Sequence, residues 1–69
     1  MSKTEYAWVI QRDDGSFFAR TEIYNFNIFC NELGNAEICS SKEIMQNIIE
    51  KQHLQNCTPV KVEIRVVGE

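Results

Sequence analysis

The sequence predicts an α+β two-layer sandwich, in which one helix covers one face of an antiparallel-rich sheet of about four strands. Three observations predict this class. Two runs of aromatic and β-branched residues flank Asp13-Asp14-Gly15, a serine-led amphipathic segment begins near residue 41, and a strictly alternating Val/Ile run lies near the end. The 69 residues form a single domain, 1–69, and their hydrophobic fraction of 43% is ordinary for a folded protein.

The first two strands are expected at about residues 4–12 and 16–21. Asp-Gly between two such runs is a strong hairpin signal, because these residues tolerate the positive φ of a tight turn. The adjacent carboxylates Asp13 and Asp14 fit the same interpretation, because Asp side chains accept hydrogen bonds from nearby backbone groups in turns. We therefore assign them to the turn and not to a catalytic pair.

Residues 21–33 follow neither the strand period nor the helix period cleanly. Their polar positions exclude a fully buried segment. We expect Ile23, Phe26 and Phe29, which are spaced by three, to close the core as a short turn of helix or a lid. Tyr24 and Ile28 are then left over for contact with a partner.

Residues 36–39 are expected to form a short strand, and residues 41–54 the helix. With Ser40 as N-cap, its hydroxyl and the Glu43 carboxylate would form a capping box. The apolar residues of the helix recur at a spacing that places them on one face: Ile44, Met45, Ile48 and Ile49.

The last strand is expected at about residues 59–67. Its alternation predicts that Val60, Val62, Ile64 and Val66 face the helix-covered core, while Lys61, Glu63 and Arg65 face out on an open sheet face. We expect the strand order 3-2-1-4, with the last strand parallel to the first.

Three features occur together in this chain: the first strand with its Asp-Gly turn, the run Ala36 to Glu43, and the alternating last strand. In this combination the chain resembles small accessory proteins of bacteriophages and bacterial mobile elements. Many such proteins have a strand that ends just before Ser-x-x-Glu and then one amphipathic helix. The resemblance implies the β-β-β-α-β layout and a small binding protein, in some cases an inhibitor of a host enzyme or defence system. It assigns no functional residue.

Charge and composition narrow the function classes. The net charge is −3 and no Lys/Arg cluster occurs, which disfavours a nucleic-acid binder. No apolar run approaches the roughly 20 residues that span a bilayer. The N-terminal residues lack the pattern of a signal peptide, and the cysteine number is odd, so we expect a cytoplasmic protein.

Metal and thiol chemistry are the other candidates. Cys30, Cys39 and Cys57 with His53 could make a Cys3His set, yet no two of the thiols have the close C-x2-C spacing of zinc knuckles. A Cys–His nucleophile would need an orienting third group, and the sequence offers none. We expect no cofactor, no metal site and no catalytic residues.

The sequence therefore predicts a small non-enzymatic protein-binding module, an inhibitor or modulator of its partner, and a homodimer is a further expectation. Two alternatives stay open: a small nucleic-acid-binding regulator, and a purely structural or oligomeric role. An exposed Trp or Tyr on an open sheet face is a typical interface anchor, and the alternative is that Trp8 and Tyr6 both lie in the core. The candidate partner-binding residues are Trp8, Tyr24, Ile28, Lys61, Glu63 and Arg65.

Overall fold

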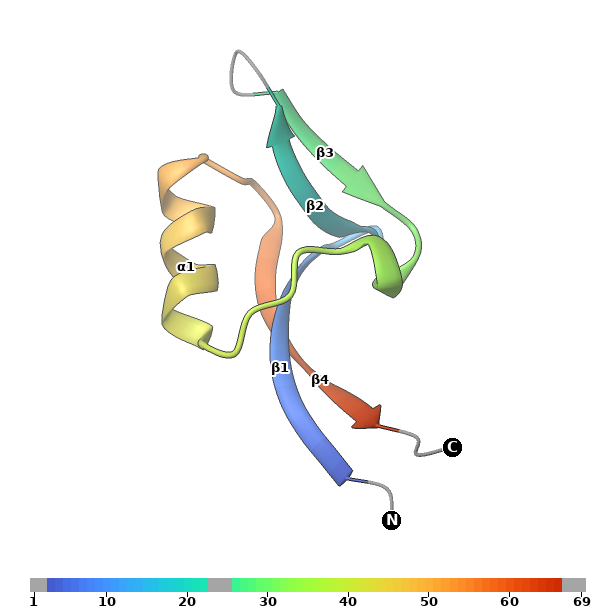
Figure 1. The fold of residues 1–69 in the computed structure, drawn as a ribbon. Coiled ribbons are helices and arrows are strands. Elements are labelled where there is room, and N and C mark those ends of the chain that lie inside the picture. Colours follow the sequence, from blue (N-terminus) through green and yellow to red (C-terminus); the bar gives the residue numbers. More distant parts are fainter. Residues whose placement is uncertain (1–2, 23–25, 67–69) are drawn as a thin grey trace.

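The computed structural model describes residues 3–22 and 26–66 and confirms the α+β class, with one helix beside a four-stranded antiparallel sheet (Figure 1). The two expected strands at the N-terminus and the one at the C-terminus are present. In chain order the elements are β1 (Lys3–Arg12), β2 (Phe17–Glu22), β3 (Phe26–Cys30), the 3₁₀ turn η2 (Leu33–Asn35), α1 (Lys42–Lys51) and β4 (Cys57–Val66).

The sheet order is β3-β2-β1-β4, which by number is the expected order 3-2-1-4. However, β4 runs antiparallel to β1, whereas a parallel direction was expected. The difference arises because the third strand lies elsewhere. Residues 26–30 form β3, so the chain reverses once more before the helix than the sequence suggested. Of the expected strand at 36–39, Cys39 forms a single bridge to Trp8, and the Glu37 amide donates to the Phe18 carbonyl of β2 at 3.0 Å.

The segment 21–33 thus contains strand, and the expected turn of helix or lid over its apolar residues is wrong. Phe26 is 66% exposed and does not close the core, whereas Phe29 packs against it. Ile23 and Tyr24 lie outside the described residues. Phe18 and Phe29 stand directly opposite each other on β2 and β3, and their ring centres lie 5.9 Å apart, edge to face. A bulge between Phe18 and Arg20 shifts the register of the rest of this strand pair.

Helix α1 begins one residue later than the expected capping box requires. Ser41 is the N-cap, and its side chain makes no capping hydrogen bond, so the Ser40–Glu43 box is not formed. The helix ends in a Schellman motif: the Leu54 and His53 amides donate to the Ile49 and Glu50 carbonyls, and His53 has φ 53°. This left-handed residue turns the chain and buries Leu54, which ends the helix earlier than expected.

The core lies between α1 and the end of the sheet near the β1–β2 turn. Ile10, Phe18, Met45 and Leu54 form its buried cluster, and Trp8 packs partly buried against it. Val9, on the opposite face of β1, is also fully buried (0% exposed). Contrary to the expectation of one buried and one wet face, the sheet buries side chains on both faces.

The face of β4 that the helix covers is the opposite of the expected one. Side chains directly across an antiparallel pair share a face, and Trp8 and Ile10 oppose Lys61 and Pro59. Lys61 therefore lies on the helix side, and Val60, Val62 and Ile64 lie on the far side. Lys61 stays exposed because α1 covers only the other end of β4, where Cys57 packs on the core.

Candidate functional site

The outer half of the β1–β4 pair forms a two-stranded ribbon, which we call the arm: residues 3–8 of β1 paired with residues 61–66 of β4. Figure 1 shows the arm extending away from α1 and from the β2–β3 hairpin. The molecule is correspondingly elongated. Its radius of gyration is 12.9 Å and its extents are 43 × 22 × 21 Å, whereas a compact domain of this length has a radius of about 11 Å.

Hydrogen bonding at Trp8 fixes which backbone groups of the arm point outward. The Trp8 amide donates to the Cys39 carbonyl at 2.7 Å, and the Cys39 amide donates back at 3.0 Å. The N–H and C=O of Trp8 therefore point away from β4, and those of Ala7 and Val9 point toward it. By the same alternation, the backbone groups of Tyr6 point away from β4.

The register carries this alternation onto β4. Ala7 pairs with Val62, and Val9 pairs with Val60. The N–H and C=O groups of these two valines therefore point toward β1. The N–H and C=O of Lys61, which lies between them, point to the outer side of β4. Pro59 is two residues from Lys61, so its backbone also faces the outer side of β4. Proline has no N–H to donate and is therefore confined to such positions in edge strands. Lys61 thus offers a backbone donor and acceptor to an added strand.

Both edges of the arm lack a neighbouring strand within residues 3–22 and 26–66. Residues 3–7, which precede the Trp8–Cys39 bridge in β1, pair with β4 alone, because β2 pairs with β1 only around Gln11. β4 is the last strand of the sheet and pairs with β1 alone. Exposed strand edges are templates for pairing with another chain.

Two aromatic side chains lie on the helix side of the arm, each with a cation above its ring. The Lys61 Nζ is 4.5 Å from the centre of the Tyr6 ring, and the Lys42 Nζ is 5.4 Å from that of Trp8. Such contacts contribute about 0.5–1 kcal/mol each at exposed sites. Tyr6 is 59% exposed and Trp8 half-buried, so this face combines apolar area with hydrogen-bonding groups.

The structure brings three of the six sequence-derived candidates together. Trp8, Lys61 and Glu63 lie on the helix side of the arm. Ile28 lies half-buried on β3, in the β2–β3 hairpin and not in the arm. Tyr24 is outside the described residues. Arg65 belongs to β4 in the arm, where its backbone alone is described.

The six sequence-derived candidates do not include Tyr6 and Phe26, the two most exposed of the described large hydrophobic side chains. Tyr6 stands across from Glu63 in the arm. The exposure of Tyr6 had no local signal, because its apolar run, residues 6–10, also contains buried residues. Phe26 stands between two asparagines, on a strand without a fully buried side chain. Tyr6 was recognisable only from the place where the helix stops covering the sheet.

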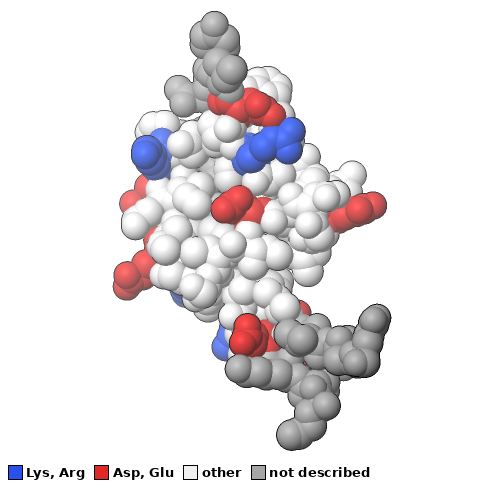
Figure 2. Space-filling view, viewed as in Figure 1, with Lys and Arg blue, Asp and Glu red and all other residues white. Residues whose placement is uncertain are grey.

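The charged side chains form no continuous patch on the face in Figure 2, where basic and acidic groups are interspersed. On β2, Arg20 and Glu22 pair at 2.7 Å. Neutralising neighbours of this kind leave no basic surface there for a phosphate backbone.

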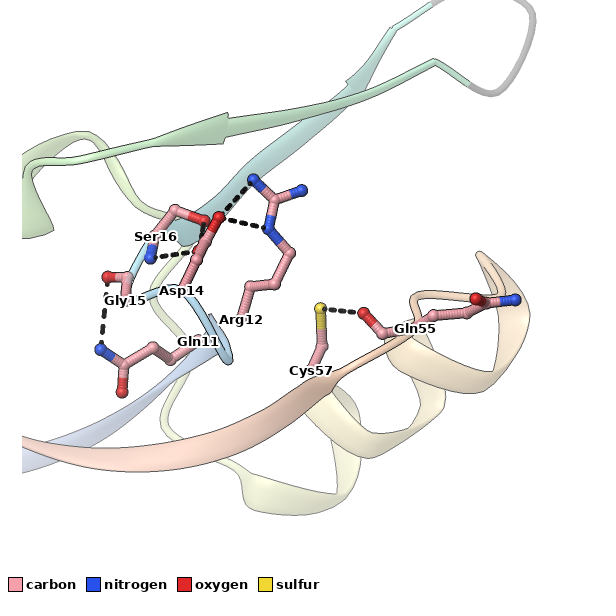
Figure 3. Close-up of polar contacts among 7 residues, drawn as sticks. All are labelled: Gln11, Arg12, Asp14, Gly15, Ser16, Gln55 and Cys57. Atoms are coloured by element: carbon pink, nitrogen blue, oxygen red, sulfur yellow. Dashed lines mark hydrogen bonds and ion pairs between the residues drawn. The ribbon is translucent and has the colours of Figure 1, made fainter.

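The Asp13-Asp14-Gly15 turn is built around Asp14 (Figure 3). The Ser16 hydroxyl and backbone amide donate to Asp14 Oδ1 at 2.6 and 2.9 Å, and Arg12 Nε donates to Asp14 Oδ2 at 3.2 Å. The Ser16 bonds, supported by Arg12, lower the pKa of Asp14 from 3.8 to about 2. Gly15 supplies φ 92°. The turn interpretation of the paired carboxylates is thus supported by geometry.

Asp14→Ala is expected to reduce stability in a pH-dependent way. Because the folded pKa is depressed, the carboxylate contributes stability above its unfolded pKa of 3.8, and this contribution is lost as the pH falls toward about 2. The difference in urea midpoint between wild type and variant should therefore shrink between about pH 4 and pH 2. A difference that stays constant from neutral pH down to that range would contradict the role of the Asp14 charge.

A pocket of about 270 Å³ lies beside this turn, lined by Gln11, Arg12, Asp13, Gly15, Asn56 and Thr58. Its cation is already engaged, since the Arg12 guanidinium contacts Asp14 and lies 4.0 Å above the Phe29 ring. Cys57 is nearby in sequence, but burial raises the pKa of its thiol, which donates to the Gln55 carbonyl at 3.3 Å. A protonated thiol is a poor nucleophile and a poor metal ligand.

Within the described ranges, no three His, Cys, Asp or Glu side chains are placed to hold a metal ion. Cys30, Cys39 and Cys57 form no disulfide. No helix among residues 3–22 and 26–66 has the length and apolarity to cross a membrane. Comparison with family models, with curated proteins and with solved structures found no match to this chain.

Proposed function

We propose that this chain is a small cytoplasmic protein-binding module without catalytic activity, which engages its partner by strand addition at the open edges of the arm. The observation that carries the proposal is the pairing pattern: residues 3–7 and β4 each have one strand neighbour in the described structure. Added strands gain affinity from main-chain hydrogen bonds, and side-chain contacts on the two faces give specificity.

The side chains around these edges support the proposal. Tyr6 presents an exposed ring beside the outward backbone groups of its own residue, and tyrosine is among the commonest interface anchors. The three cysteines form no disulfide, which suits a reducing compartment. A partner held in this way would be inhibited or modulated by occlusion, because strand addition covers the segment that it pairs.

Nucleic-acid binding gains less support. The net charge is −3, and the basic side chains of Arg12 and Arg20 are each paired with a carboxylate. A binder of nucleic acid depends on several cations that meet phosphates, and the affinity falls steeply with salt.

The proposal is tested by affinity capture from lysate followed by mass spectrometry, with one edge blocked at a time. Tyr6→Pro removes an outward donor from β1, and Lys61→Pro removes one from β4, without taking a hydrogen bond from the β1–β4 ladder. Glu43→Pro is the matched control, because the first turn of a helix accepts proline. At least one edge variant should lose a partner that wild type and control retain; identical capture by all four proteins would refute strand addition.

A further inference from the structure

Resting on the proposed function, we infer that the strand added at the outer edge of β4 is β4 of a second copy of this chain, paired antiparallel about a two-fold axis at Val62. The axis would place Lys61 opposite Glu63 of the second copy, and by symmetry Glu63 opposite Lys61. The two sheets would then form one continuous eight-stranded sheet, counted from the four strands of each copy.

Side-chain charge selects this register. Lys61 has its backbone groups on the outer side of β4, and so does Glu63, two residues further along; their side chains lie on one face of the arm. A two-fold axis at Val62 opposes unlike charges twice. An axis at Lys61 or at Glu63 would instead set like charges directly across the new interface, which is destabilising.

Strand length favours the same axis over the other charge-compatible one. An axis at Val62 pairs residues 58–66, nearly all of β4, whereas an axis at Ile64 opposes Glu63 to Arg65 and pairs only residues 62–66 of the strand. Pro59 then falls near the end of the pairing, where a missing donor matters least. The centre of β4 and the centre of its charge pattern thus coincide.

Apolar contacts on the face of the arm opposite the helix would also stabilise the dimer. With the axis at Val62, this residue meets its own counterpart, and Val60 meets Ile64. Val60 and Val62 are half-buried and Ile64 is 37% exposed in the single chain. Pairing would cover part of the exposed surface of all three, and a domain of this size gains stability from such added burial.

Charge reversal with rescue tests the inference, read out by sedimentation velocity and by circular dichroism for folding. Wild type should be a dimer, and Lys61→Glu and Glu63→Lys should each be folded and at least about tenfold weaker in association. An equimolar mixture of the two variants should dimerise again, because two acidic side chains on one copy then meet two basic side chains on the other. The double variant Lys61→Glu/Glu63→Lys should dimerise as well.

Cysteine cross-linking fixes the register. In a non-hydrogen-bonded antiparallel pair the Cα atoms are about 4.5 Å apart, which is within disulfide range. Val62→Cys should therefore give an oxidised covalent dimer much faster than Ile64→Cys, with wild type and its three native thiols as background. Faster linkage through Ile64→Cys would overturn the Val62 axis.

The outcomes separate this inference from the proposed function. A wild type that stays monomeric up to about 1 mM overturns the dimer inference. A dimer whose association is unchanged by all the charge reversals overturns it as well. If the wild type is monomeric and Lys61→Pro still loses a captured protein, β4 takes a foreign strand and the proposed function stands. If the dimer forms as described and no edge variant changes capture, the inference holds and the proposed function fails.

Discussion

Replacing Met45 by alanine is expected to lower the free energy of unfolding by about 2–5 kcal/mol. Met45 is 0% exposed and lies in the cluster with Ile10, Phe18 and Leu54, so its removal leaves a cavity between α1 and the sheet. A 69-residue domain has a total stability of only about 3–10 kcal/mol. The loss is therefore a large fraction of the total, and the variant should unfold at a clearly lower urea concentration than the wild type.

Ile44→Ala provides the matched control for this loss. Ile44 precedes Met45 in α1 and is 49% exposed, so its truncation should cost less than about 1 kcal/mol. Urea unfolding followed by the fluorescence of Trp8 would compare the two midpoints. Equal destabilisation by both variants would mean that α1 does not bury its Met45 side against the sheet.

Proline at two adjacent positions of β4 is expected to give opposite results. Val62 pairs with Ala7, and its N–H points toward β1, so Val62→Pro removes a ladder bond. Ala7 is 4% exposed, and its carbonyl could not turn to water, so the loss should be at least about 1–3 kcal/mol. In protein dilute enough to be monomeric, Lys61→Pro keeps every ladder bond and should cost about 1 kcal/mol or less.

Thermal unfolding of the two proline variants checks this pair. A stable Lys61→Pro and a strongly destabilised Val62→Pro are the expected results. If Lys61→Pro is the worse of the two, the backbone groups of Lys61 point toward β1. The open edge would then carry the other residues of β4, and both the strand-addition proposal and the Val62 axis would be wrong.

Local signals predicted the first hairpin correctly, because a turn at Gly15 is set by residues next to one another. The alternation of β4 was also correct as a pattern, but not the choice of face. That choice depends on where α1 ends above the sheet, which leaves Lys61 exposed on the helix side. No periodicity within residues 59–67 contains this information.

The strand β3 was missed because its neighbours in space, not its own pattern, make it a strand. Phe26 and Phe29 suggested a helical spacing, yet Phe26 is exposed and Phe29 packs edge to face against Phe18, its direct partner on β2. Residues 36–39 have a strand-like pattern, but β2 diverges from β1, and the segment forms the Cys39 bridge to β1 and one hydrogen bond from Glu37 to β2 in place of a strand. The same divergence opens the inner edge of the arm, so the candidate site is a property of the tertiary structure.

Amide hydrogen exchange at Lys61, measured residue by residue by NMR at two protein concentrations, tests the open edge of β4 most directly. In dilute protein, the Lys61 amide should exchange fast while those of Val60 and Val62 are protected by β1. At high concentration, pairing with a second copy should slow the Lys61 amide and leave the valines as they were. A Lys61 amide protected as well as that of Val62 at every dilution would contradict an open edge on β4.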